Sequence, residues 1–325
     1  MRTHLMRYAI LASLGGITIP AFAADDATDT LVNIQLPDGL VEEIQQALPE
    51  RADVNQEFLN TNYDPNLSFQ TDAHVAITFL DEGAGYKNSL GYFTYGNDTF
   101  NGFTFADGDT NGNGYIGISE LKDIDGVAAE MIFSNASEYR GGGKLLPGDT
   151  VALGDASIVN VNGTDFEMTG GETFGSDTNM GFFLMQNAAA GNSGLVKGWD
   201  ITNLDPKVFY TVDFLNPENS PTATEDNPAE YSRHVAMMNS VSADNDIIIG
   251  FEDLVRPGGD NDFNDAVFRV RTDPTQAMFA VVPTSMQVVA MQAAPAPLAG
   301  NGASGMMMLA ASMLFIYRRR KTEKA

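Results

Sequence analysis

Oxygen-bearing side chains recur at a regular spacing in the segment DTNGNGYIGISE, which runs from Asp109 to Glu120. Asp109, Asn111 and Asn113 occupy its first, third and fifth places, and Glu120 occupies the twelfth. A twelve-residue calcium loop needs oxygen ligands at places 1, 3, 5, 7, 9 and 12 and a glycine at place 6. Tyr115, at place 7, would contribute its backbone carbonyl. The segment thus has the side chains that a Ca²⁺ site requires.

Two glycines and one apolar residue complete the pattern. Gly114 occupies the sixth place, where such a loop turns sharply, and Ile116 at the eighth place is expected to face the core. Gly117 at the ninth place has no side chain, so a water would fill that position. The segment therefore predicts a calcium site of the EF-hand type, and an Asn/Gly-rich surface turn is the alternative.

The flanks of this loop do not predict a complete EF-hand. The preceding residues, NGFTFADGD, are not expected to form a helix, and a helix after the loop is short at best because Gly126 follows ELKDID. Asp109 and Glu120 are the only acidic ligands, so we expect a Kd of about 10⁻⁴ to 10⁻³ M, as in extracellular modules. Such an ion would have a structural role and would not act as a sensor.

A second acidic cluster lies in FEDLVRPGGDNDFNDAVFRV, around a Pro-Gly-Gly turn between two apolar strands. Carboxylates forced together in this way repel one another unless a cation or a shared proton relieves the repulsion. The segment predicts a second Ca²⁺ site, and an acidic hairpin loop in water is the alternative. The predicted ligands are Glu252, Asp253, Asp260, Asp262 and Asp265.

These sites must be positioned by a fold rich in strands. Residues 24–70 form a lead-in segment, in which PDGLVEEIQQALPE has helical spacing, with Asp38 as the expected cap and Pro49 as the end. From residue 71 to 272, runs such as HVAITFL, MGFFLMQ and DAVFRVRT read as strands between Gly/Asn/Asp turns. We expect an all-β fold, an antiparallel β-sandwich of jelly-roll type with long loops, a short N-terminal helix and the EF-hand-like loop inserted at 107–125.

The N-terminal end predicts export. Arg2 and Arg7 give a positive start, the run from Tyr8 to Ile19 is apolar, and Ala21-Phe22-Ala23 is a cleavage motif. Residues 1–23 therefore predict a secretory signal peptide.

The C-terminal end predicts attachment to a membrane. A linker at 273–297 ends in Pro295-Ala296-Pro297, and Leu298 to Tyr317 is long enough for a membrane helix before the basic RRRK. This tail, 298–325, resembles the exosortase-type sorting signals of bacteria, in which Pro-Glu-Pro is the usual motif. A plain single-pass anchor is the alternative; in both cases the body faces outward.

Several segments resemble a known family. The stretches VAITFLDEGAGYKNSLGYFTY and IIIGFEDLVRPGGDNDFNDAVFRV, with IFSNAS, GGGKLLPGDTVALG and MGFFLMQN between them, are similar to the bacterial family of secreted domains of unknown function 4114. The resemblance covers residues 70–272, and its F-E-D and D-x-D-F-N-D pattern includes Asn264 with the five acids. It implies an exported, surface-attached, β-rich domain and no established activity.

Composition narrows the classes of function. The chain has 43 Asp and Glu against 18 Lys and Arg, a net charge of −25, which makes nucleic acid a poor partner. It has no cysteine, so thiolate chemistry is excluded. His74 and His234 read as structural histidines, and no nucleophile elbow or zinc-protease motif is present, so we do not expect an enzyme.

Together these features predict an exported calcium-binding β-sandwich displayed at the cell surface. Its role would be structural or adhesive, with extracellular polysaccharide or envelope proteins as partners, and it would contact the membrane through the C-terminal helix before any processing. The alternative is a carbohydrate-active hydrolase that uses two Asp or Glu residues.

Overall fold

The computed structural model describes residues 31–59, 66–139, 141–190, 205–243, 246–275 and 277–279. The predicted signal peptide, the sorting tail and most of the predicted linker lie outside these residues. Among the described residues, no helix is both long and apolar enough to cross a membrane.

One antiparallel sheet, which we call sheet A, carries the acidic residues at 252–265 in a hairpin between β12 (Ile247–Phe251) and β13 (Ala266–Asp273). These two strands pair with each other, and Phe251 lies opposite Ala266 at the end nearest the acidic residues. In spatial order, sheet A consists of β1 (Val32–Asn33), β6 (Asp149–Ala152), β3 (His74–Asp81), β13 (Ala266–Asp273), β12 (Ile247–Phe251) and β11 (Val235–Asn239).

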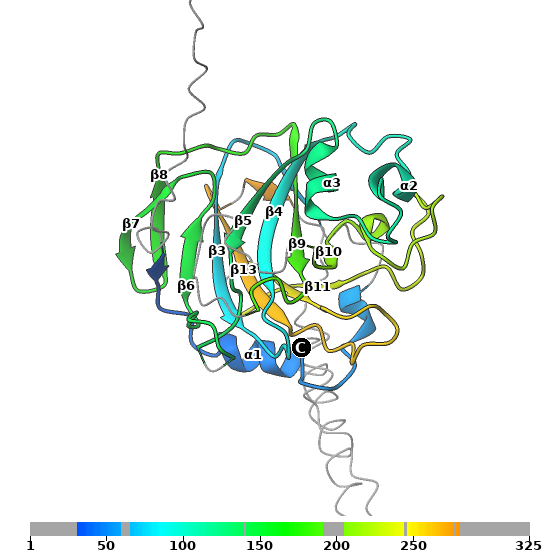
Figure 1. Ribbon diagram of the computed structural model, residues 1–325. Helices are drawn as coiled ribbons and strands as arrows, with labels where there is room; N and C mark the ends of the chain where they lie inside the picture. The colour runs from blue at the N-terminus through cyan, green and yellow to red at the C-terminus, as the bar shows by residue number, and fades with distance from the viewer. Residues whose placement is uncertain are drawn as a thin grey trace, which may run out of the picture.

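A second antiparallel sheet, sheet B, faces the first (Figure 1). Its order is β14 (Met278–Phe279), β2 (Leu67–Phe69), β9 (Thr178–Met185), β4 (Ser89–Gly96) and β5 (Ala128–Phe133), and β10 (Val208–Tyr210) also pairs with β9. A separate hairpin is formed by β7 (Ser157–Asn162) and β8 (Asp165–Thr169).

The main core lies between the two sheets. The rings of Phe182 in sheet B and Phe268 in sheet A meet with centroids 5.0 Å apart. Val75, Ile77 and Phe79, which alternate along β3, all belong to this core. The predicted all-β sandwich is thus confirmed.

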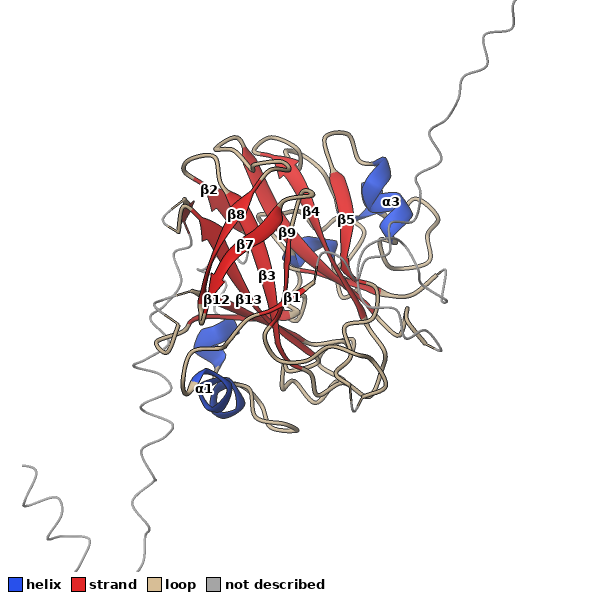
Figure 2. Cartoon of the chain, turned by 90° about the vertical axis from the view of Figure 1, so that its left-hand side faces the viewer, coloured by secondary structure: helices blue, strands red, loops and turns tan. Residues whose placement is uncertain are grey.

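The outer face of sheet A is also covered, by α1 (Leu40–Ala47) and η2 (Gln56–Leu59). The predicted helix is confirmed, but the prediction that Asp38 caps it was wrong. Gly39 is the N-cap, with φ 83°, a left-handed conformation that glycine adopts without steric cost. Figure 2 shows α1 on the side of the sandwich opposite α3 (Ile118–Asp123).

The EF-hand-like loop lies in the connection between β4 and β5, flanked by α2 (Phe105–Gly108) and α3. The expectation that no helix precedes the loop was wrong. Asp107 accepts hydrogen bonds from the backbone N–H and the hydroxyl of Thr104, both at 2.8 Å, and the N–H of Phe105 bonds to the carbonyl of Ala223. These contacts hold a single turn that local propensity alone would not form.

Candidate metal centre

The acidic residues at 252–265 occupy the loop that joins β12 to β13. Asn261 and Phe263 both have left-handed backbone conformations, with φ 56° and 55°, on either side of Asp262. Phe263 is fully buried beneath the loop, and the guanidinium of Arg256 lies 4.9 Å from the centre of its ring. The loop is therefore held in a fixed conformation by its own packing.

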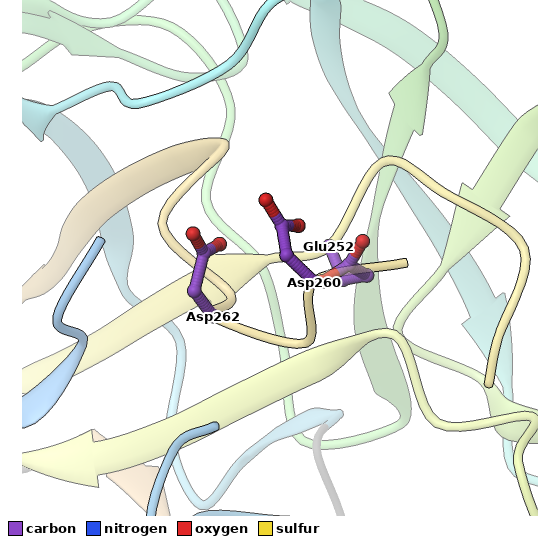
Figure 3. A group of neighbouring side chains, drawn as sticks. All are labelled: Glu252, Asp260 and Asp262. Atoms are coloured by element: carbon purple, nitrogen blue, oxygen red, sulfur yellow. The ribbon is translucent and has the colours of Figure 1, made fainter. Parts of the chain in front are cut away.

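This conformation brings three carboxylates together. One carboxylate oxygen from each of Glu252, Asp260 and Asp262 lies within 4.8 Å of those of the other two. Figure 3 shows the side chains of Asp260 and Asp262 rising in the same direction from the loop. Glu252 and Asp262 are buried, whereas Asp260 is exposed, so the group opens to solvent on one side.

Glu252 is the most unusual member of this acidic centre. Glu252 is 0% exposed, and neither carboxylate oxygen accepts a well-formed hydrogen bond. Burial, followed by the charges of Asp260 and Asp262, raises its pKa from the usual 4.5 to about 7, although a weak interaction with the backbone N–H of Leu254 opposes the shift. A β-carbon at Gly259 would come within 2.3 Å of Glu252 Oε1, so only glycine leaves room for this carboxylate. A buried, unpartnered carboxylate of this kind requires a proton or a cation.

Asp262 is held in place from two sides. Its Oδ2 accepts a hydrogen bond of 2.8 Å from the backbone N–H of Arg51, and its Oδ1 accepts one of 3.4 Å from the N–H of Asn264. Burial raises the pKa of Asp262, although both hydrogen bonds oppose the shift. The carboxylate is therefore oriented toward Glu252 and Asp260 before any ion binds.

The chemistry of the centre favours a hard cation. Three carboxylates without nitrogen or sulfur ligands suit Ca²⁺, Mg²⁺ or Mn²⁺. Ca²⁺ accepts about six to eight oxygens in flexible geometry, whereas Mg²⁺ demands near-octahedral geometry. Three carboxylates from one irregular loop, completed by water on the side of Asp260, match the requirements of Ca²⁺ more closely.

Asp253 and Asp265 do not join the other three acids. Asp253 Oδ2 accepts a 2.5 Å hydrogen bond from the side chain of Asn88, and the backbone N–H of Asp253 donates to Asp265 Oδ2 at 2.7 Å. Burial raises the pKa of Asp253 to about 6, and burial with the charge of Asp253 raises that of Asp265. The single five-acid cluster expected from the sequence is thus divided, with Asp253 turned toward sheet B.

The sequence did not point to Glu82, which follows β3 at the same end of the sandwich. Its Oε2 accepts a hydrogen bond of 3.1 Å from the N–H of Glu138, and its Oε1 is buried without a partner. Burial, with the charges of Glu138 and Asp253, raises its pKa to about 7. Its position between a strand and a Gly-rich turn gave no signal, because such acids are usually solvated.

A buried polar network supports the acidic centre from behind. The two ring nitrogens of His234 lie 2.9 Å from the carbonyl of Glu252 and 3.0 Å from Glu218 Oε1. Glu218 Oε1 also accepts a bond from the backbone N–H of Arg256, whose side chain donates to Asn261. These buried contacts fit the interpretation of His234 as a structural histidine, which stays a prediction. The network fixes both ends of the acidic loop.

The EF-hand-like loop directs its oxygen atoms inward. The carboxylate of Asp109 accepts hydrogen bonds of 3.0 Å from the N–H groups of Asn113 and Gly114. Glu120 closes the loop by accepting bonds from the N–H groups of Asn111 and Gly117, at 3.0 and 2.8 Å. The first and last predicted ligands therefore lie across the same small loop, as a calcium site requires.

The loop is also anchored to the core as expected. Gly114 makes the sharp turn with φ 89°, and Ile116 is fully buried. The hydroxyl of Tyr210 donates a 2.8 Å hydrogen bond to the carbonyl of Ile116. Tyr115, whose carbonyl is the expected ligand at place 7, has its N–H bonded to Asn113 Oδ1 at 3.1 Å. An ion held here would stabilise the contact between this loop and β10.

Part of the chain is similar to a known family. Residues 174–273 match the family model of a domain of unknown function, DUF4114. The DUF4114 match runs from β9 to the end of β13 and includes the whole acidic hairpin, while the EF-hand-like loop lies outside it. The resemblance predicted for residues 70–272 is thus confirmed for this part, and for residues 70–173 it stays a prediction. No curated protein and no solved structure matches the chain.

The raised pKa of Glu252 predicts a pH dependence for the metal-free protein. A carboxyl that binds its proton more tightly when folded stabilises the fold below its unfolded pKa of 4.5 and loses that contribution as pH rises through about 7. We expect the free energy of unfolding to fall between these values, by up to about 3 kcal/mol from Glu252. Denaturant unfolding of the metal-free protein, in the presence of a chelator and across this pH range, measures the change in the free energy of unfolding.

The variant Glu252→Gln is the control for this dependence. It keeps the neutral form at every pH, so its profile should be flatter than that of the parent, with the remaining slope arising in part from Glu82. Saturating calcium should also abolish the decline, because the cation favours the ionised carboxylate. An unchanged profile in Glu252→Gln would contradict the assignment.

Proposed function

We propose that this protein binds calcium at the acidic centre of its β12–β13 hairpin and uses the ion to hold a surface-displayed β-sandwich in its functional conformation. The observation that carries the proposal is the Glu252 side chain, which is fully buried, accepts no well-formed hydrogen bond and lies beside the carboxylates of Asp260 and Asp262. The energetic cost of this arrangement is removed by a divalent cation.

The EF-hand-like loop supports a second calcium site in the same protein. Its two carboxylates and two amide side chains follow the calcium-loop spacing, and the loop backbone already orients Asp109 and Glu120. With only two negative charges, this site should be the weaker one and should fill at extracellular calcium concentrations of about a millimolar.

The sequence also indicates where this calcium-bound sandwich would act. The predicted signal peptide and sorting tail favour a protein displayed at the bacterial surface, where the strong negative charge keeps it soluble. A structural or adhesive role toward envelope proteins or polysaccharide fits these features better than catalysis does.

Isothermal titration of calcium into the metal-free protein tests the proposal. We expect two classes of site in the parent and loss of the tighter class in Glu252→Gln. The matched control is Asp177→Asn, which removes one exposed carboxylate at the far end of β9 and should leave both classes intact. Equal binding by Glu252→Gln and the parent would contradict the proposal.

Removal of the closing ligand should disable the loop site alone. We expect Glu120→Gln to abolish the weaker binding class and the stabilisation that appears at millimolar calcium, because Glu120 is the one residue that spans both ends of the loop. A thermal shift across a calcium series measures this effect. If Glu120→Gln retains the full millimolar response, the loop is a surface turn and not a calcium site.

A further inference from the structure

The segment Leu40–Leu59, which we call the N-terminal strap, packs on the outer face of sheet A, and the turn in its middle lies against the acidic centre. It consists of α1, the turn that follows, and η2. Its apolar side chains pack on residues of β3, β12 and β13 in one cluster. The strap side chains in that cluster are Leu40, Ile44, Ala47, Leu48, Val54, Phe58 and Leu59.

The turn of the strap contacts the acidic loop between β12 and β13 directly. The N–H of Arg51 donates to Asp262 Oδ2 at 2.8 Å, and the N–H of Val54 donates to the carbonyl of Asn261 at 3.3 Å. Leu48 lies so close to β12 that a β-carbon at Gly250 would come within 2.6 Å of its Cδ1. The Asp262 carboxylate, which would bind the cation, therefore also accepts a hydrogen bond from the strap.

The strap also brings a negative charge to the centre. Glu50 Oε2 accepts a bond of 3.3 Å from the side chain of Asn264, which places the Glu50 carboxylate beside the acidic loop. Arg51 pairs with Glu50 at 3.2 Å, but their side chains are 82% and 52% exposed, so water screens the pair. Docking of the strap onto the metal-free centre thus adds to the repulsion among carboxylates, and a cation would remove that repulsion.

We infer that docking of the N-terminal strap is coupled to calcium binding at the acidic centre. This inference rests on the proposed calcium site. Calcium fixes Asp262 in the orientation that accepts the Arg51 N–H and cancels the charge that opposes Glu50, so the ion tightens the strap. The strap in turn orients Asp262 for the ion. The ion connects two parts of the chain that lie some two hundred residues apart in sequence.

Linkage makes this coupling measurable from both directions. The factor by which calcium favours the docked strap must equal the factor by which the docked strap favours calcium. Couplings of this kind are typically about 5- to 150-fold. A substitution that weakens docking of the strap at a distance from the ion should therefore lower the affinity for calcium.

Hydrogen exchange on the full chain measures the first direction. The N–H groups of Leu48 and Phe58 bond within the strap, to the carbonyls of Ile44 and Asn55, and touch no residue of the acidic centre. We expect calcium to slow their exchange by about 5- to 150-fold. The variant Glu50→Gln should slow exchange in the metal-free protein and shrink the calcium effect.

Calcium titration of Ile44→Ala measures the second direction. Ile44 is buried under α1 and does not contact the centre, yet the variant should bind calcium more weakly there, by up to the same factor. The control is Met168→Ala, a comparable buried truncation in the β7–β8 hairpin, which should leave the affinity unchanged.

The outcomes separate the coupling from the site itself. If calcium binds in a manner that Glu252→Gln abolishes, yet strap exchange and the affinity of Ile44→Ala are unchanged, the coupling is overturned and the site stands. If the tighter binding class is absent from the parent, both the site and the coupling are overturned.

Discussion

The substitution Asp262→Asn should remove the calcium response of the acidic centre without unfolding the protein. The asparagine still offers an oxygen to the Arg51 N–H and gives up only the long 3.4 Å bond from the N–H of Asn264, but the centre loses one of its three acidic groups. Loss of an outer-shell group typically weakens a metal site by about 10- to 100-fold, so loss of a ligand should weaken it at least as much. At calcium about a hundredfold above Kd the parent gains about 2.7 kcal/mol, which corresponds to roughly 5–11 °C for a domain of this size. Thermal unfolding with and without calcium measures the difference.

The metal-free state of the same variant provides the internal control. Because one of the clustered charges is gone, Asp262→Asn should unfold in chelator at the same temperature as the parent or higher. The double variant with Glu120→Gln should show no calcium response at all. If the variant in chelator were less stable than the parent by as much as it is in calcium, Asp262 would be a structural acceptor for the strap and not a ligand.

The substitution His234→Leu should cause a large loss of stability at any calcium concentration. The two ring nitrogens of His234 lie within hydrogen-bond distance of Glu218 Oε1 and the carbonyl of Glu252. His234 is 0% exposed and stacks on Phe209 at 4.2 Å, so leucine would fill the space but would remove both buried hydrogen bonds. A buried polar group that loses its partner costs about 1–3 kcal/mol, and this substitution affects two such groups. Denaturant unfolding measures this loss.

His74 provides the matched control for this experiment. Its ring makes one hydrogen bond, of 2.8 Å, to the carbonyl of Gly170 and is only partly buried. The same change, His74→Leu, should therefore cost less than about 1.5 kcal/mol. Equal losses in the two variants would show that the two buried hydrogen bonds of His234 stabilise the fold no more than the single bond of His74 does.

Much of the fold could be predicted from local patterns. The alternating run that became β3 and the apolar runs that became β9 and β13 fixed the fold class, since strands of this kind need a facing sheet. Burial on the outer face of sheet A was not predicted, because it depends on where α1 docks. The helix α2 was missed for a similar reason, since its single turn relies on a contact with Ala223, far away in the sequence.

The acidic centre was predicted in part, and simple geometry explains the remainder. Neighbouring residues of an extended chain point to opposite faces, so Glu252 and Asp253 could not both face one ion. Asp260 and Asp262 meet because the loop between the strands turns, with left-handed conformations at Asn261 and Phe263 that the sequence did not indicate. Glu218 and Arg51 could not be found from the sequence, because only the tertiary fold brings them to the hairpin.

The most direct test of the calcium site is a crystal structure grown in calcium, with anomalous scattering recorded at a long wavelength. The account predicts a calcium peak at about 2.3–2.6 Å from carboxylate oxygens of Glu252, Asp260 and Asp262, with waters completing the shell on the side of Asp260. A map with no peak among these three carboxylates, from crystals in which the EF-hand-like loop is occupied, would contradict it and would leave Glu252 as a buried, protonated acid.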